Sequence, residues 1–406
     1  MFIKLNQINI IFMYALPVAA FSLLISSALT NIFLFASVLY ALQHCIRNSN
    51  FQILFDKQFF KFIYLLFTFL LCSSLYSVAE TADILSLLKK YVKLLYIPIL
   101  YYLINVQKNE KIIMEFFIYG CSIILFLSYI KYYNFFDFSY FYDFLKYINL
   151  ANVQEKIIIT RASIFQNYII QGTILSFYSF LCLYLATKKN IFIYYILSFL
   201  SFINVLFLND SRAAYIIILC LTLISFYKII TNNKIRICFL LIFISFMFTQ
   251  YASNFEKRVG NIASDVKLIE NNNYKSSLGL RLTWAKIGLN NLIDSPFYGY
   301  GVGSYKVTTE KYLHNSQIVD KQYFVTSNPH NEFISISSQL GLPGLILFLL
   351  FMLYLIKESS GVLSIGVSVL VIISSTFNSA FYDNMLGLFL VIIISLLYQK
   401  KFKIEK

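Results

Sequence analysis

Charged residues are scarce in this chain, and their scarcity argues against a soluble fold. Only 13% of the 406 residues are charged, whereas 59% are hydrophobic. Because soluble domains carry about 25% charged residues, this composition indicates a protein that crosses a membrane several times. The hydrophobic runs are continuous and do not alternate over about ten residues, which favours membrane-spanning helices over a membrane β-barrel.

The chain also lacks the usual patterns for metals and disulfides. Its six cysteines all lie within or at the ends of hydrophobic segments, without the spacing of a zinc site or of a disulfide framework. No Asp-x-Asp motif occurs, so no metal–diphosphate site of the usual carboxylate type is visible. We therefore expect no metal and no other cofactor.

Hydrophobic segments long enough to span a bilayer, or nearly so, fill most of the chain. A hydrocarbon core of about 30 Å needs about 20 helical residues. The predicted spans are 8–28, 30–46, 58–79, 84–105, 112–131, 165–186, 190–208, 211–229, 236–251, 333–356, 361–379 and 383–399. The second, ninth and last are short or weakly bounded, so eleven or thirteen spans are alternatives. The expected fold is all-α, a polytopic membrane protein with about twelve transmembrane helices.

The net charge of +14 follows this topology and does not indicate a nucleic-acid surface. Lys and Arg gather at alternate span ends, as they do in short cytoplasmic loops. Both termini are therefore expected in the cytoplasm, and 132–164 and 252–332 on the outer side. The chain then divides into 1–251 with nine spans, the large outer loop 252–332, and 333–406 with three spans and a cytoplasmic tail.

The outer loop is predicted to be partly helical. The stretch SSLGLRLTWAKIGLNNLIDSP has apolar residues at helical spacing and ends at Pro296. The next stretch, SPFYGYGVGSY, has Gly299, Gly301 and Gly303 at alternate positions. It predicts a turn-rich loop and not a nucleotide site, because no strand precedes it and no Lys-Ser/Thr follows.

Three lysines lie in the outer half of the fourth predicted span, in LLKKYVKLL. Lys89 and Lys93 are four residues apart and are expected to share one helix face, with Lys90 nearby. Lysine in a span is costly and marks a function unless it reaches the interface. Reaching the interface accounts for one lysine, but three close together repel each other unless an anion is present. We therefore predict an anion site here.

Two arginines on the outer side are further candidates, and each has an ordinary alternative. Arg212, in NDSRAAY, lies between the seventh and eighth spans and can pair with Asp210 beside a helix cap by Ser211. Arg281 lies on the outer helix, where a solvated helix face is the default interpretation. Chemistry alone does not separate these alternatives from a ligand role.

One of the three histidines stands at the membrane boundary. His330 follows Pro329 directly before the tenth span, in SNPHNEFISISSQLGLPGL. There an imidazole meets both lipid-borne and water-borne substrates, and its pKa suits proton transfer near neutrality. Glu332 is expected to favour the positive start of the following helix. His314, in YLHNSQ, is expected to be an ordinary surface residue.

Three stretches together resemble the O-antigen ligase and polymerase superfamily of bacterial inner-membrane glycosyltransferases. They are SRAAYIIIL, GLRLTWAKIGLNNLIDSPFYGYGVGSY and NPHNEFISISSQLGLPGLILFL, and RASIFQNYIIQG resembles a weaker feature. The resemblance extends roughly from Asn209 to Leu350. It implies that His330 is the essential histidine. The diphosphate-binding residues that it implies are Arg212, Arg281, one of Lys90 and Lys93, and the weaker candidate Arg161.

The resemblance also implies a reaction. The donor is a glycan on undecaprenyl diphosphate, and the acceptor is a hydroxyl of the lipid A-core oligosaccharide at the periplasmic face. The enzyme is implied to be metal-independent and inverting, to sit among membrane lipids and to bind no nucleic acid. A polymerase that joins lipid-linked repeat units is the alternative within the superfamily. A transporter is the more distant alternative, and it needs no His330.

Overall fold

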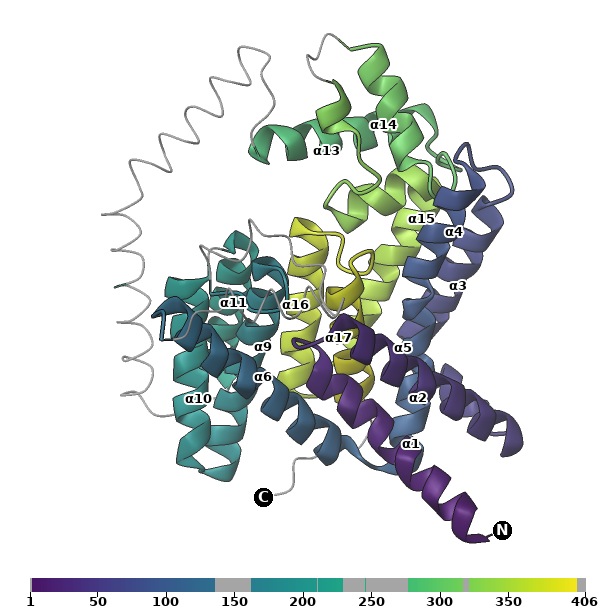
Figure 1. Cartoon of the computed structure of the whole chain (residues 1–406). Coiled ribbons are helices and arrows are strands. Elements are labelled where there is room, and N and C mark those ends of the chain that lie inside the picture. The colour runs from purple at the N-terminus through teal and green to yellow at the C-terminus, as the bar shows by residue number, and fades with distance from the viewer. Residues whose placement is uncertain are drawn as a thin grey trace.

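The computed structural model describes residues 2–135, 162–209, 211–228, 245, 277–316 and 321–399. Within these ranges every regular element is a helix, as the composition predicts. The longer helices are α1 (Phe2–Ser22), α2 (Ser27–Arg47), α3 (Gln58–Ser73), α4 (Thr81–Tyr91), α5 (Lys93–Gln107), α6 (Glu110–Tyr132), α9 (Tyr168–Lys189), α10 (Phe192–Ile203), α11 (Arg212–Lys228), α13 (Ser277–Asp294), α14 (Tyr305–His314), α15 (Glu332–Lys357), α16 (Val362–Phe377) and α17 (Asn384–Leu397) (Figure 1). The short ones are η1 (Gln52–Phe55), η2 (Asn204–Leu208) and η3 (Lys321–Phe324).

Helices occur at eleven of the twelve predicted spans. The remaining segment, 236–251, lies outside the described residues apart from Ser245. In the described part of the chain, α2, α6, α9 and α15 are each long and apolar enough to cross a membrane. Shorter apolar helices fall at several of the other predicted spans. The total of about twelve spans stays a prediction, and so does the side of the membrane on which each connection lies.

Two helices form the centre of the bundle, and their residue pattern explains why. Nearly all of α17 is buried, and so is most of α9. A helix that is apolar on all sides is stable only when other helices surround it or lipid covers it. Some hydroxyls inside are satisfied across helices: the Ser179 hydroxyl donates to the Ser198 carbonyl at 2.8 Å, and the Ser201 hydroxyl to the Leu175 carbonyl at 2.9 Å.

The predicted outer helix is α13, and it lies with α14 at one end of the molecule above α15 (Figure 1). The partly helical character of the predicted loop is therefore confirmed for residues 277–316 and 321–332. The first part of this loop, 252–276, lies outside the described residues. So do residues 136–161, most of the other predicted outer segment.

A glycine-rich turn fastens the unit formed by α13 and α14 to the bundle. The predicted turn glycines Gly299, Gly301 and Gly303 have φ values of 63°, 85° and 83°. Gly301 donates its N–H to the Gln339 carbonyl of α15 at 2.9 Å, and Leu342 donates to the Pro296 carbonyl at 2.7 Å. Gly341 between them has φ 66° and interrupts α15. Only glycine adopts this conformation at little cost, so the turn locks α13 onto a kink in α15.

The fourth predicted span differs from the expectation, because it is two helices. A single residue, Val92, separates α4 from α5, and the Leu95 amide donates to the Val92 carbonyl, three residues back, at 3.0 Å. The prediction that Lys89 and Lys93 share one face is therefore wrong. Lys89 is exposed, whereas the Lys93 side chain is 5% exposed. The two residues that were expected to project together are thus one surface lysine and one interior lysine.

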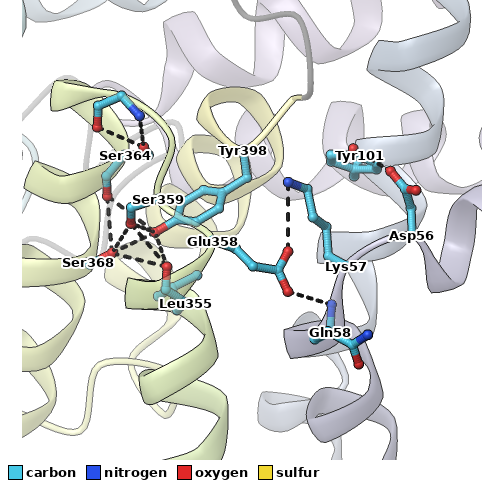
Figure 2. Close-up of polar contacts among 11 residues, drawn as sticks. Asp56, Lys57, Gln58, Tyr101, Leu355, Glu358, Ser359, Ser364, Ser368 and Tyr398 are labelled. Atoms are coloured by element: carbon cyan, nitrogen blue, oxygen red, sulfur yellow. Dashed lines mark hydrogen bonds and ion pairs between the residues drawn. The ribbon is translucent and has the colours of Figure 1, made fainter.

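A polar region lies where α15 ends, and its side chains form hydrogen bonds and an ion pair with one another (Figure 2). Lys57 Nζ lies 3.7 Å from a Glu358 oxygen, and Glu358 also accepts the backbone N–H of Gln58 at 2.6 Å. The Tyr398 hydroxyl lies 2.6 Å from the Ser368 hydroxyl and 3.1 Å from that of Ser359. We call these five side chains and that of Ser364 the Tyr398 cluster: Lys57, Glu358, Ser359, Ser364, Ser368 and Tyr398.

Candidate active site

His330 is held in an uncommon backbone conformation directly before α15. Its φ is 54°, a left-handed value that few residues other than glycine adopt. The Asn328 side chain holds it there, because Oδ1 accepts the His330 N–H at 2.9 Å. Asn331 then caps the helix, with Oδ1 accepting the Ile334 N–H at 3.0 Å. The predicted position of His330 at a helix start is confirmed.

The imidazole of His330 is half-buried between two elements. On one side the Trp284 ring of α13 lies with its centroid 5.3 Å away, tilted by 34°. Trp284 is itself fixed, because its indole N–H donates to the Phe324 carbonyl at 2.8 Å. On the other side His330 Nδ1 lies 3.3 Å from Asn378 Oδ1. Helix α13 and the connection between α16 and α17 therefore both contact this histidine.

Arg281 interacts electrostatically both with His330 and with Arg212, the other predicted arginine. Arg212 is the first residue of α11 and Arg281 lies in the first half of α13. Partial loss of hydration lowers the pKa of Arg281, the nearby Tyr168 raises it, and the like charge of Arg212 lowers it again. Among the described residues no carboxylate forms an ion pair with either arginine. Two close cations without a carboxylate partner make a site that favours an anion.

The lysines at the α4–α5 break have different partners. The Lys93 ammonium donates to the Asp383 carbonyl at 2.5 Å and to the Asn384 carbonyl at 3.4 Å. Gly387 leaves room for it, since a Cβ there would lie 2.7 Å from Lys93 Nζ. Lys90 Nζ lies 3.5 Å from the centroid of the Tyr382 ring. Lys93 is thus engaged in holding α17, and Lys90 is the lysine that keeps donors for a ligand.

A buried carboxylate organises the connection between α16 and α17. Glu332, the first residue of α15, is fully buried and accepts hydrogen bonds from the Tyr91 hydroxyl and, at 2.9 Å, from the Phe381 N–H. Its position at the positive helix start is as expected. Glu332 therefore ties α4, α15 and residues 376–383 together behind His330.

Four helices begin around this region, which adds to its positive potential. Side-chain caps mark the four starts: Asn167 for α9, Ser211 for α11, Asn331 for α15 and Asp383 for α17. The electrostatic contacts connect them, because Arg281 interacts with Tyr168 and Arg212. His330 in turn interacts with Arg281 and Asp383. Helix starts present free N–H groups and a positive dipole end, which suits a phosphate.

The surroundings of His330 keep its imidazole neutral. Burial lowers the pKa of His330 from its ordinary value of 6.5, the hydrogen bond to Asn378 raises it, Arg281 lowers it and Asp383 raises it, with a net lowering. Near neutral pH the ring is therefore unprotonated at one nitrogen and can accept a proton. His314 differs, since it is exposed at the end of α14, and the surface prediction for it is confirmed.

Two residues named in the sequence analysis, Arg161 and Asp210, lie outside the described ranges.

One segment of the candidate site was not predicted from the sequence. The missed segment is residues 376–383, which the sequence assigned to the ends of two spans and the short connection between them. Its polar run NSAFYDN between two apolar stretches was the available signal. Its partners lie about 50 residues earlier in the chain, so their contacts do not follow from local pattern.

Comparison with known proteins agrees with the resemblance of the sequence motifs. A family model described as O-Antigen ligase matches residues 196–349. The O-antigen ligase of Escherichia coli (strain K12) is 30% identical over 192 residues, which cover 44% of this chain and 45% of that protein. The resemblance seen in the motifs is confirmed: over this region the chain is similar to O-antigen ligases.

The matched region covers part of the site only. Residues 196–349 include Arg212, Arg281 and His330. The lysines at the α4–α5 break and residues 376–383 lie outside it. The aligned part is also less than half the length of the Escherichia coli relative. The match to this family and the apolar helices together indicate an integral membrane protein.

Proposed function

We propose that this protein transfers a glycan from undecaprenyl diphosphate to a hydroxyl of the lipid A-core oligosaccharide. The reaction takes place at the periplasmic face of the bacterial inner membrane, in a multi-pass protein with both termini in the cytoplasm. One observation supports this most strongly. In a region that matches the O-antigen ligase family model, the half-buried His330 interacts with Arg281, which in turn interacts with Arg212, and neither arginine has a carboxylate partner in the described chain.

The donor diphosphate binds to the cations and the helix starts. Arg212 and Arg281 offer planar forks that match phosphate oxygens, and Lys90 adds a point charge. Arg161 is a further candidate for the same diphosphate. When the glycosidic bond breaks, the negative charge that grows on the leaving diphosphate meets these fixed positive charges. The leaving group is a stable anion, so the step needs no strong general acid and we propose that it needs no metal.

The acceptor hydroxyl is activated by His330. The imidazole takes the hydroxyl proton while the oxygen attacks the anomeric carbon on the face opposite the diphosphate. The new carbon–oxygen bond forms as the bond to the diphosphate oxygen breaks, so a single displacement inverts the anomeric centre. The proton then leaves His330 for solvent, and undecaprenyl diphosphate is the second product.

Surface glycolipid analysis tests this function against its alternatives. In a strain whose own copy is deleted, a ligase defect leaves bare core glycolipid while long polymer accumulates on its lipid carrier. Core capped by one repeat unit, without long carrier-linked polymer, would identify a polymerase instead. Unchanged glycolipid would count against both and favour a transporter. Gel separation of lipopolysaccharide together with extraction of carrier-linked glycan reads all three outcomes.

A further inference from the structure

We propose that Asn378 fixes the tautomer of His330, holding the imidazole proton on Nδ1 so that Nε2 is the atom that receives the acceptor proton. This rests on the proposed function of His330 as base. Asn378 lies 48 residues after His330, at the end of α16, and its Oδ1 is 3.3 Å from His330 Nδ1. Asn378 is therefore a positioning residue that acts through the histidine.

The contacts of Asn378 determine which atoms donate. Its Oδ1 also accepts the backbone N–H of Ser379 at 3.0 Å. A backbone N–H only donates, so the Asn378 atom that faces both partners must be the amide oxygen. An amide oxygen only accepts, so His330 Nδ1 must carry the hydrogen. In the neutral ring the free lone pair is then on Nε2.

Two further asparagines hold the pair in register. Asn328 Oδ1 accepts the His330 N–H at 2.9 Å and the Ser379 hydroxyl at 2.6 Å. Asn331 Nδ2 donates to the Thr376 carbonyl at 2.8 Å. The backbone on both sides of the imidazole is thereby tied to the segment that presents Asn378. A tautomer set by such a fixed partner stays set when substrate enters, whereas one set by water does not.

Charged groups on the neighbouring elements define what a substitution does to the pH dependence. His330 faces Arg281 on α13 and Asp383 at the start of α17. Asn378→Asp keeps an acceptor for Nδ1–H and adds a negative charge, which favours the imidazolium and raises the pKa of His330. Asn378→Ala removes the acceptor and adds no charge. Asn378→Ala therefore tests the effect of losing the tautomer, and Asn378→Asp tests the effect of an added charge.

Nitrogen NMR of the histidines tests the tautomer without reference to catalysis. The chain has only three histidines, His44, His314 and His330, so the full-length protein labelled with ¹⁵N-histidine in lipid nanodiscs gives few signals. Comparison with His330→Gln identifies the signals of His330. At a pH where the ring is neutral, we expect Nδ1 to be protonated in the wild type and the proton to shift towards Nε2 in Asn378→Ala. A wild-type ring protonated on Nε2, or no change in Asn378→Ala, would overturn the proposal.

Transfer kinetics test the consequence for the proposed base. With an undecaprenyl-diphosphate-linked glycan and core glycolipid, Asn378→Ala should lower kcat by about 10²-fold at unchanged KM, the cost of a misplaced catalytic group. Asn378→Asp should restore most of kcat and move the acid limb of the pH profile to higher pH. Asn315→Ala is the matched control, because it removes a similar contact, 3.4 Å, from His314.

The same assay separates failure of this inference from failure of the proposed function. Full transfer by His330→Ala would show that His330 is not the general base, and the proposed function of this residue would fail. The NMR result on the tautomer of the imidazole would still hold. Loss of transfer in His330→Ala with full transfer in Asn378→Ala would keep the base and overturn the role of Asn378. Should Asn378→Ala fold poorly, a pH profile of Asn378→Asp identical to that of the wild type would also overturn it.

Discussion

α15 connects two polar regions that use similar side chains in opposite ways. Where it ends, Lys57 lies 3.7 Å from Glu358, and the hydroxyls of the Tyr398 cluster bond to each other (Figure 2). Where it begins, Arg212 and Arg281 lie near each other, and no carboxylate in the described chain pairs with them. The first region is complete within the protein. The second, as we propose, is completed by the diphosphate of the donor.

Lys93 shows that the difference lies in the partners and not in the residue type. It is a buried cation at the His330 end, yet two backbone carbonyls of α17 satisfy it. Lys90, three residues earlier, lies over the Tyr382 ring. A cation satisfied by protein oxygens supports the fold, whereas one without them is available to a ligand. Substitutions at the two ends of α15 should therefore separate transfer from stability.

The largest effect is expected for the proposed base. His330→Ala should reduce transfer by about 10²–10⁴-fold, the usual contribution of a general base. Donor binding should survive, because the cations hold the diphosphate. His314→Ala should transfer at the wild-type rate, since that side chain is exposed and outside the site. Equal rates for the two variants in the purified transfer assay would contradict the role of His330 as the general base.

The arginines come next. Arg212→Ala and Arg281→Ala should each reduce transfer by about 10²–10³-fold, the cost of one lost donor to developing charge. Arg→Lys at either position should recover only part of the rate, because the planar fork is lost. The protein should remain in the membrane at wild-type abundance, as immunoblotting can check. Wild-type transfer by both alanine variants would contradict the proposal that these arginines bind the donor diphosphate.

Lowering the pH should reduce transfer about tenfold per unit once the pH falls below the pKa of His330. The sign follows from the base role, because protonation removes the lone pair that accepts the acceptor proton. Burial places this pKa below the ordinary value of 6.5, so activity should be retained at pH 6.5 and lost only in more acidic buffer. A rate that does not depend on pH between 4.5 and 7 would contradict the role, provided that folding is unchanged by circular dichroism.

The two lysines should separate stability from binding. Lys93→Ala should lower stability by about 1–3 kcal/mol, because buried oxygens lose a charged donor. It should appear as a lower midpoint of thermal unfolding in detergent. Lys90→Ala should leave that midpoint unchanged and weaken donor binding. The reverse pattern would assign the phosphate contact to Lys93.

The smallest effect is expected at the other end of α15. Lys57→Ala removes a partly exposed ion pair, so stability should fall by no more than about 1 kcal/mol. Transfer and donor affinity should match those of the wild type, because the Tyr398 cluster has no role in the reaction. A strong loss of transfer with normal folding would show that the two ends of α15 are coupled.

Local signals were sufficient for much of this architecture. Hydrophobic runs identified the helices, and Pro329 marked the helix start beside His330. Pro296 and the alternating glycines marked the end of α13 and the turn that follows. These features depend on neighbours within a few residues, and their geometry follows from backbone rules.

Other features depend on distant contacts and could not be predicted. The inward turn of Lys93 requires the break at Val92 and the space beside Gly387, nearly 300 residues later. The pairing of His330 with Asn378 requires two connections to meet at one end of the bundle. Sequence pattern assigned residues 376–383 to two span ends and the connection between them, because it reports hydrophobicity and not the partners of polar side chains.

Binding of undecaprenyl diphosphate without a glycan tests the central contrast most directly. The full-length protein in nanodiscs is titrated with this lipid, and affinity is compared for the wild type, Arg281→Ala and Lys57→Ala. The contrast predicts that Arg281→Ala weakens binding by at least about tenfold, the loss of one charged hydrogen-bonded contact. Lys57→Ala should bind as the wild type does, because its lysine already has a partner in the protein. Equal affinity for the two variants would contradict the claim that unpaired cations at the His330 end form the diphosphate site.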